Sequence, residues 1–302
     1  MINNGYGVEY GAVKLREIYA RPGKIFSIEF FPPKSEKGDE SLFREIEALK
    51  SLNPAFCSVT YGAGGSTRER TVDLVERIHA ECCLEVMCHL TVVGQSKEQV
   101  RLVLERLRDK KIENLIALSG DPPQGVADWK PHPDGFRHSI ELVKEAVAYG
   151  CFSIAVAGFP EVHPRAKSRD EDLRYLKEKV DAGADAIITQ LFFDNEHYFR
   201  FVEDLRRLGV AVPIVPGVLP ILSAAQVRRF TDLCGAKIPS GLEQRLARVE
   251  NDDEEAVKLG VDYATEQCRR LLAFGAPGLH FYSLNKARSV KAIFDNLGLA
   301  SG

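Results

Sequence analysis

KIFSIEFFPP, residues 24–33, is the stretch on which the fold prediction rests. Apolar and aromatic side chains run through it almost without interruption, which is typical of a buried β-strand, and the double proline prevents a ladder or helix from continuing. One carboxylate, Glu29, stands inside this run. A buried charge is costly unless it is paired, neutralised or used. Glu29 is therefore a structural ion-pair partner, a residue on a solvent-exposed face of the strand, or a functional residue.

The same unit recurs along the chain: a short apolar strand, then small or polar residues, then an amphipathic helix. Strands are predicted within 24–33 and over 56–60, 84–90, 113–118, 151–157, 185–190, 212–216 and 278–283. Helices are predicted over 39–52, 68–80, 96–109, 137–149, 169–182, 195–208, 223–234, 253–274 and 285–297.

Eight strand-then-helix units without a linker predict an α/β fold, the (β/α)8 TIM barrel, with residues 1–302 as one catalytic domain. A two-domain alternative would need a boundary near 125–135, which resembles a loop. A short helix at about 11–20 is expected to cap one end of the barrel. The region 236–275 is longer than one helix needs, so we expect an extra helical segment between strands seven and eight.

Composition excludes several classes of protein. The chain has 302 residues, 45% of them hydrophobic, and a net charge of −3, without a basic stripe that would indicate nucleic-acid binding. Its seven cysteines are odd in number and never spaced as CxxC, so we expect neither disulfides nor a metal site. No apolar run is long enough to span a membrane, and no signal peptide is recognisable, which predicts a cytoplasmic protein.

Barrel enzymes place their chemistry at the carboxyl ends of the strands. Polar residues at these ends are therefore predicted to form one ring: Glu29, Thr60, His89, Asp121, His163, Gln190 and Tyr282. No GxGxxG follows a strand and no GxxxxGK[ST] is present, so dinucleotide and P-loop motifs are unsupported.

Eight segments in order give a more specific indication. They are FSIEFFPP at 26–33, SVTYGAGGSTRERT at 58–71, HLT at 89–91, GDPP at 120–123, FPEVHP at 159–164, KVDAGADAIITQLFFD at 179–194, PGVLP at 216–220 and HFYSLNK at 280–286. This pattern resembles the methylenetetrahydrofolate reductases from about residue 20 to the C-terminus, and is similar to the bacterial form without a regulatory domain.

The resemblance implies a TIM-barrel flavoprotein of one-carbon metabolism that binds FAD noncovalently. NADH or NADPH would reduce the flavin and leave, after which 5,10-methylenetetrahydrofolate would take the hydride and become 5-methyltetrahydrofolate. In such an enzyme the cofactor carries the hydride, and the protein supplies orientation and charge. The expected partners are a small-molecule folate and further copies of the chain in a homo-oligomer, with no nucleic acid and no membrane.

Two carboxylates match catalytic positions of the family. Glu29 matches the acid that protonates a departing folate nitrogen, and its apolar strand is expected to raise its pKa toward that task. Asp121 matches an aspartate near flavin and folate, where its charge would lower the flavin potential and stabilise a cationic folate iminium. A plainer explanation for Asp121 is a turn aspartate before Pro122.

The resemblance also implies a set of flavin-binding residues. At Ser119 the chain departs from the family, which usually has arginine there, so one hydroxyl replaces a guanidinium fork. Asp172, Tyr175 and Lys179 share one face of a helix, although a solvated charged face would have the same spacing. The implied FAD-binding residues are Thr60, Tyr61, Ala63, His89, Ser119, Gly120, Asp121, Ser139, Phe159, His163, Ala166, Asp172, Tyr175 and Lys179.

Residues that match folate or nicotinamide contacts in the family are Glu29, Gln190, Gln226, Tyr282 and Lys286. Gln190 ends an apolar strand, so its amide needs polar partners, and a pterin edge offers complementary donors and acceptors. Lys286 stands where the family often has arginine and could meet a glutamate tail.

Two other functions remain open at this point. A barrel lyase or aldolase could use Glu29 as an acid without flavin. Alternatively, a folate- or flavin-binding subunit could have lost catalysis, for which Ser119 would be the sign, although the presence of Glu29 argues against it.

Overall fold

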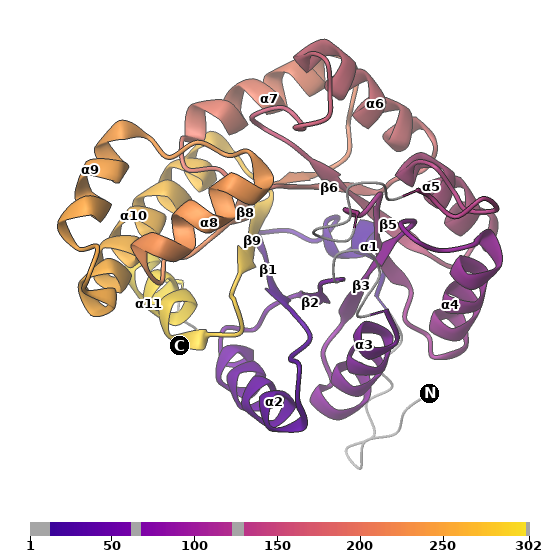
Figure 1. The fold of residues 1–302 in the computed structure, drawn as a ribbon, viewed down its shortest axis with the longest axis horizontal. Helices are drawn as coiled ribbons and strands as arrows, with labels where there is room; N and C mark the ends of the chain where they lie inside the picture. Colours follow the sequence, from indigo (N-terminus) through magenta and orange to yellow (C-terminus); the bar gives the residue numbers. More distant parts are fainter. Residues whose placement is uncertain (1–12, 62–67, 123–129, 300–302) are drawn as a thin grey trace.

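The computed structural model describes residues 13–61, 68–122 and 130–299. Parallel strands form a central ring with helices around its outside (Figure 1). The strands are β1 (Ile25–Phe30), β2 (Phe56–Val59), β3 (Val86–Thr91), β4 (Asn114–Leu118), β5 (Ser153–Gly158), β6 (Ala186–Thr189), β7 (Ile214–Val215), β8 (Gly217–Val218) and β9 (Gly278–Tyr282). Their order in the sheet is β7-β6-β5-β4-β3-β2-β1-β9-β8.

A helix follows each strand except β7, as expected for a (β/α)8 barrel, and one short helix precedes β1. The helices are α1 (Leu15–Ile18), α2 (Glu36–Lys50), α3 (Arg68–Cys82), α4 (Lys97–Asp109), α5 (Ser139–Ala148), α6 (Arg169–Asp181), α7 (Asn195–Arg207), α8 (Ala224–Cys234), α9 (Ser240–Arg248), α10 (Asp253–Phe274) and α11 (Ala287–Leu297).

The predicted seventh strand, 212–216, is shorter in the structure, where it is β7, and a separate strand, β8, follows it beyond the predicted bounds. β7 pairs with β6, and β8, which begins after Pro216, pairs with β9. Proline lacks the N–H that a ladder needs, so β7 ends before Pro216 and β8 pairs with a different neighbour. The chain itself thus completes the ring across Pro216, and the TIM-barrel prediction is confirmed.

Helix α1 lies inside the predicted 11–20 helix, of which residues 11 and 12 fall outside the described part. Leu15 and Ile18 are fully buried and belong to a cluster with the inward-facing residues Ile25, Phe56 and Met87. Because these residues come from the beginnings or the lower halves of their strands, α1 closes the amino-terminal end of the barrel.

The extra helical segment between the last two strands is confirmed: α8, α9 and α10 all lie between β8 and β9. In Figure 1 they form the orange flank of the molecule beside β8 and β9. Leu219 and Val227 pack there with Leu191 and Leu242 in a separate apolar cluster. Within the described ranges, no helix has the length and apolar character needed to cross a membrane.

Candidate active site

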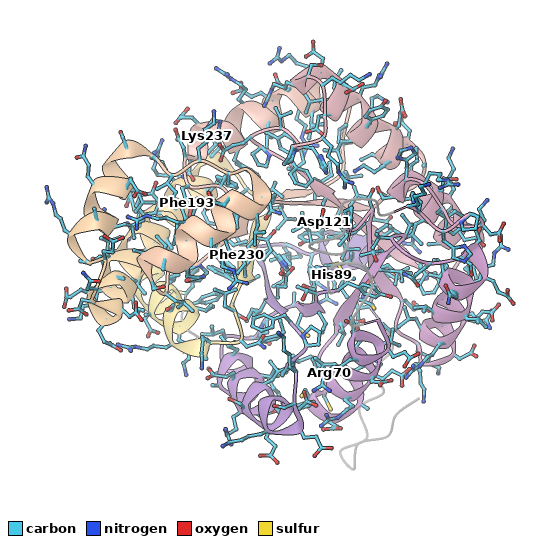
Figure 2. The ribbon with its side chains drawn as sticks, viewed as in Figure 1. Arg70, His89, Asp121, Phe193, Phe230 and Lys237 are labelled. Carbon is cyan, nitrogen blue, oxygen red and sulfur yellow. The ribbon has the colours of Figure 1, made fainter. Side chains whose placement is uncertain are left out.

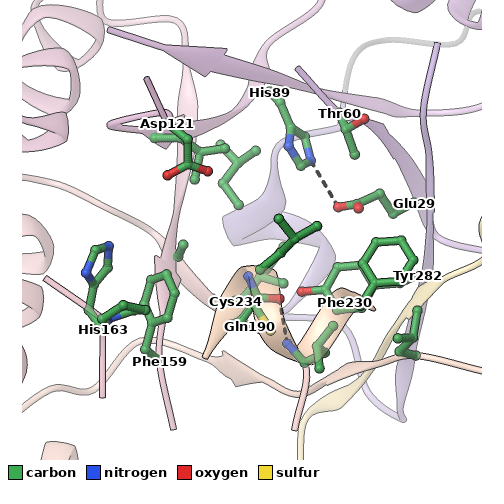
Figure 3. Close-up of a pocket in the computed structure, with 18 of the residues that line it drawn as sticks. Glu29, Thr60, His89, Asp121, Phe159, His163, Gln190, Phe230, Cys234 and Tyr282 are labelled. Atoms are coloured by element: carbon green, nitrogen blue, oxygen red, sulfur yellow. Dashed lines mark hydrogen bonds and ion pairs between the residues drawn. The ribbon is translucent and has the colours of Figure 1, made fainter. Parts of the chain in front are cut away.

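A pocket of about 560 Å³ opens at the carboxyl ends of the strands. It falls within the size range of small-molecule sites and at the end of the barrel where TIM-barrel chemistry takes place. Figure 3 shows the side chains that converge on it from opposite sides of the ring. All seven residues that the sequence places in one ring line this pocket: Glu29, Thr60, His89, Asp121, His163, Gln190 and Tyr282.

Strand alternation directs Glu29 into the pocket. Ile28 and Phe30 point outward into the core between strands and helices, whereas Glu29 lines the cavity. In the sheet Glu29 lies beside Ser58 of β2 and Tyr282 of β9. The one charged residue of the opening strand therefore faces the interior of the barrel.

Two histidines face the Glu29 carboxylate, which is 17% exposed. Its Oε2 atom lies 3.3 Å from Nε2 of His89 and 3.6 Å from Nε2 of His280. Burial raises the pKa of Glu29, but the facing imidazoles of His280 and His89 outweigh burial and lower it to about 2. The expected upward pKa shift is therefore wrong for this arrangement, and Glu29 is ionised at neutral pH.

This ionisation predicts a pH dependence of stability. Because the pKa of Glu29 falls from 4.5 to about 2 on folding, its contribution is fully present above pH 4.5 and is lost as pH drops toward 2. At about 1.4 kcal/mol per pKa unit, the loss amounts to roughly 3 kcal/mol. Urea unfolding of wild type and Glu29→Gln between pH 2 and 7 measures it. The difference in unfolding free energy between the two proteins should shrink with acid, and a constant difference would contradict the ionised pair.

Asp121 lies on the rim of the pocket, with an exposed side chain whose Oδ1 is 3.9 Å from Nη2 of Arg165. Before it, Gly120 has φ +78°, and a Cβ there would lie 2.5 Å from Val93 Cγ1. Only glycine fits this left-handed turn without displacing its neighbours. Ser119 Oγ accepts a hydrogen bond of 3.4 Å from the backbone N–H of Ser139, at the start of α5.

The loop after β5 is tied to α6. Asp172 accepts a 2.9 Å hydrogen bond from the backbone N–H of His163, and the N–H of Ala166 donates to the His163 carbonyl. Lys179 Nζ lies 3.5 Å from the carbonyl oxygen of Ala157. Burial lowers the pKa of Lys179 to about 8, and nearby Asp172 counteracts part of the effect. Tyr175 is half exposed and does not line the pocket.

The predicted folate-contact residues do not all lie in one place. Tyr282 donates a 2.5 Å hydrogen bond to the Thr189 carbonyl, and Gln190 Oε1 accepts one from Leu191 N–H; both residues line the pocket. Gln226, in the first turn of α8, accepts a hydrogen bond from Leu222 N–H. Lys286 is exposed, 4.0 Å from Glu45. Neither Gln226 nor Lys286 lines the pocket.

Three further predicted cofactor residues are Phe159, Tyr61 and Ala63. Phe159 lines the pocket and packs edge-on against His163, with ring centroids 4.4 Å apart. Tyr61 follows Thr60, and its hydroxyl accepts a hydrogen bond from Gln95 Nε2. Ala63 lies outside the described residues.

Sequence reasoning did not single out His280, Arg165, Phe230 or Leu233 as site residues. Phe230 and Leu233 on α8 line the pocket, and Figure 2 shows Phe230 at the edge of the central opening, across from His89 and Asp121. Two signals could have found these residues. His280 is two residues from Tyr282 on one strand, hence on the same inward face, and Phe230 and Leu233 follow Gln226 at helical spacing.

Known proteins of one family match this chain. The family model described as methylenetetrahydrofolate reductase matches residues 14–298. The chain is 41% identical over 297 residues to methylenetetrahydrofolate reductase (NADH) 1 of Arabidopsis thaliana, covering 95% of this chain and 50% of that protein. It is 37% identical over 276 residues to 5,10-methylenetetrahydrofolate reductase of Escherichia coli (strain K12), covering 91% of each.

A solved structure shares the fold at low sequence identity. It is an uncharacterized protein from Clostridium thermocellum that binds two copies of 5-methyl-5,6,7,8-tetrahydrofolic acid, with a TM-score of 0.63, 16% identity, and coverage of 95% of this chain and 98% of that one. The chain spans about half the length of the plant relatives and nearly all of the bacterial ones. By family match and identity, the chain belongs to the methylenetetrahydrofolate reductase family.

Proposed function

We propose that the protein reduces 5,10-methylenetetrahydrofolate to 5-methyltetrahydrofolate with electrons from NADH or NADPH, passed through a noncovalently bound FAD. The observation that carries the proposal is that Glu29, Asp121 and Gln190 line one pocket, in a chain of this family. Glu29 would supply an acid, and Asp121 would supply a negative charge for a cationic intermediate. Gln190 would supply an amide for the pterin edge. Membership of the family supports the folate substrate.

The residues around the pocket fit a flavin. Its walls include the apolar side chains of Ile116, Leu118 and Phe159, which suit a planar ring system. Two cations would serve a phosphate-bearing cofactor. Arg165 lies on the rim, and Lys179, which does not itself line the pocket, lies 3.5 Å from the carbonyl oxygen of the pocket residue Ala157. Bound FAD would supply two-electron hydride transfer. Lys179 and Arg165 would hold its anionic part, with Ser119 in place of a stronger donor.

The remaining chemistry belongs to side chains of the chain. Opening the imidazolidine ring of the folate requires a proton on the departing nitrogen. Glu29 is a carboxylate in this structure, so it would first take up a proton and then deliver it to that nitrogen. Asp121 would stabilise the iminium cation that results. Gln190 and Tyr282 would orient the pterin, since both line the pocket. The predicted folate contacts of Gln226 and Lys286 rest on the family resemblance alone, because neither residue lines the pocket.

The visible spectrum of the purified protein tests this function. We expect a flavin spectrum that bleaches when NADH or NADPH is added anaerobically and returns when 5,10-methylenetetrahydrofolate follows, with 5-methyltetrahydrofolate as product. A colourless protein that takes up no FAD would favour a flavin-free barrel enzyme. Flavin that binds but is not reoxidised by folate would favour a binding subunit.

Lys179→Met is expected to weaken FAD retention by tenfold or more, because a charge-assisted hydrogen bond to a phosphate is worth roughly 1.5–3 kcal/mol. The measurement is the flavin fluorescence released on dilution. Lys177→Met is the matched control, since Lys177 lies on the same helix and pairs with Asp181, away from the pocket. Equal flavin release from both variants would contradict the role of Lys179.

A further inference from the structure

The connection between β9 and α11 contains two consecutive residues with a left-handed backbone. Leu284 has φ +53° and Asn285 has φ +56°. Asparagine tolerates this conformation, whereas leucine adopts it only at a cost in free energy. In the described part of the chain, no other two adjacent residues both have a positive φ. Such a conformation persists only where the surrounding structure holds it, which makes this corner a candidate for a functional role.

The other left-handed residues with a Cβ have plainer explanations or different places. Asn53, Cys83 and Lys111 each come within three residues of the end of a helix, where a left-handed residue is a common way for a helix to stop. Val162 lies in the loop after β5 and does not line the pocket. Leu284 follows a strand instead, and its side chain lines the pocket.

The side chain of Asn285 ties this corner to the end of β1, which lies beside β9 in the barrel (Figure 1). Its Oδ1 accepts a 3.0 Å hydrogen bond from the backbone N–H of Phe31, and its Nδ2 donates one of 2.8 Å to the Phe31 carbonyl. The backbone ladder between the two strands ends at the pair of Glu29 and Tyr282. An amide side chain carries the same donor and acceptor as a peptide group, so Asn285 continues the pairing where the backbone has turned away.

Ser283 fixes the other side of Leu284. Its backbone N–H and its Oγ both donate to the Glu29 carbonyl, at 3.3 and 2.6 Å. The N–H of Asn285 donates back to Ser283 Oγ at 3.2 Å, and the N–H of Lys286 donates to the Ser283 carbonyl at 3.0 Å. Leu284 is therefore held between two residues that are both bonded to β1, and its backbone cannot relax without breaking these bonds.

The corner places an apolar side chain at the pocket. Leu284 packs against the apolar cluster that contains Leu191 and Leu219, and all three residues line the pocket. Tyr282, two residues earlier, lines it as well. A folate has an aromatic body between its pterin and its charged tail, and this body needs an apolar surface against which to pack.

We propose that Asn285 is a positioning residue for substrate binding, which locks the left-handed corner and thereby holds Leu284 against an apolar part of the folate. The inference rests on the proposed function, because the occupant of the pocket is the folate. Asn285 acts through Leu284 and does not itself touch the substrate. An apolar contact away from the reacting atoms stabilises the bound substrate and the transition state alike, so its loss raises KM and leaves kcat unchanged.

The first test uses the FAD-loaded enzyme with Asn285→Gly. Glycine adopts the left-handed conformation at no cost but makes neither hydrogen bond to Phe31. The KM for 5,10-methylenetetrahydrofolate should rise on the order of tenfold, the effect of one lost apolar contact. The kcat, the flavin reduction rate at saturating NAD(P)H and the flavin released on dilution should all stay within about twofold of wild type. Asn285→Asp keeps the acceptor alone and should give an intermediate KM.

Asn296→Ala is the matched control. Its side chain lies on α11, donates a hydrogen bond to Thr265 Oγ1 and does not line the pocket. This variant should keep the wild-type KM. A rise in KM that is equal in Asn285→Gly and Asn296→Ala would show a general loosening of the β9–α11 region and would overturn the role of Asn285.

A double-mutant cycle tests whether Asn285 acts through Leu284. Leu284→Ala keeps the bonds of Asn285 and should raise the KM by a similar factor. Adding Asn285→Gly to Leu284→Ala should change the KM by less than about twofold, because the contact is already lost. If the two effects multiply instead, the residues act separately and the proposal is overturned. A wild-type KM in Asn285→Gly would overturn it as well.

These outcomes differ from failure of the proposed function. If wild type takes up FAD but does not reduce folate, the proposed function fails. The same cycle, measured as the Kd of 5-methyltetrahydrofolate from the change in flavin absorbance, then still decides on Asn285. If wild type binds no folate at all, both proposals are overturned.

Discussion

Glu29→Gln is expected to lose folate reduction by a factor on the order of 10²–10⁴, the usual contribution of a general acid, while flavin reduction by NAD(P)H continues. Glutamine keeps the shape of the side chain and still accepts a hydrogen bond, but it cannot release a proton to the folate nitrogen. Rapid mixing of reduced enzyme with 5,10-methylenetetrahydrofolate, compared with NAD(P)H–menadione turnover, separates the two half-reactions.

The matched control is Glu85→Gln, at the opposite end of the same barrel. Glu85 accepts hydrogen bonds from the N–H of Val13 and from Asn114 Nδ2, and burial raises its pKa although these hydrogen bonds oppose the shift. Its replacement should leave folate reduction intact. Full folate turnover in Glu29→Gln would refute the assignment of the acid, whereas loss of folate reduction in both variants would indicate general damage to the barrel.

Gly278→Ala is expected to cause the largest loss of stability, more than about 4 kcal/mol, in the range of severe core disruption. A Cβ at position 278 would lie 1.7 Å from the carbonyl oxygen of Ile25 and 2.5 Å from its carbonyl carbon. Backbone atoms cannot rotate aside as a side chain can, so β9 would have to move away from β1. The pairing of all five residue pairs between β1 and β9 would be weakened together.

Urea unfolding followed by circular dichroism measures the loss. Gly241→Ala is the control, because a Cβ there meets nothing within 4 Å and the residue lies in α9. Alanine in a helix is favoured over glycine by roughly 0.5–1 kcal/mol, so this variant should be as stable as wild type or slightly more stable. Equal unfolding midpoints for the two variants would contradict the close approach of β9 to β1.

Much of the fold could be predicted because it depends on local periodicity. The apolar run before Pro32 and the helical spacing of Leu173 and Leu176 each follow from a few consecutive residues, and Leu173 and Leu176 are indeed buried. The break at Pro216 was harder to foresee. A proline at the end of a predicted strand gives no sign that the next two residues will pair with a different neighbour.

The ring of site residues was predictable for a related reason, since a barrel collects the carboxyl ends of its strands at one mouth. The protonation state of Glu29 could not be predicted in this way. Burial and charge partners shift a carboxyl pKa in opposite directions, and the outcome depends on distances to β3 and β9, far away in the sequence. The same applies to Arg165, which approaches Asp121 across a loop.

Neighbouring strands of the barrel differ in how many residue pairs they share. β1 and β9 share five paired residues, whereas β6–β7 and β8–β9 share two each. Local opening begins where few ladder hydrogen bonds must break at once, so backbone amides on both sides of Pro216 should exchange with deuterated solvent before those of β1. Thr189 and Tyr282 flank this stretch and are joined by a hydrogen bond across it. Local opening of the barrel would therefore begin next to Tyr282, a residue that lines the pocket.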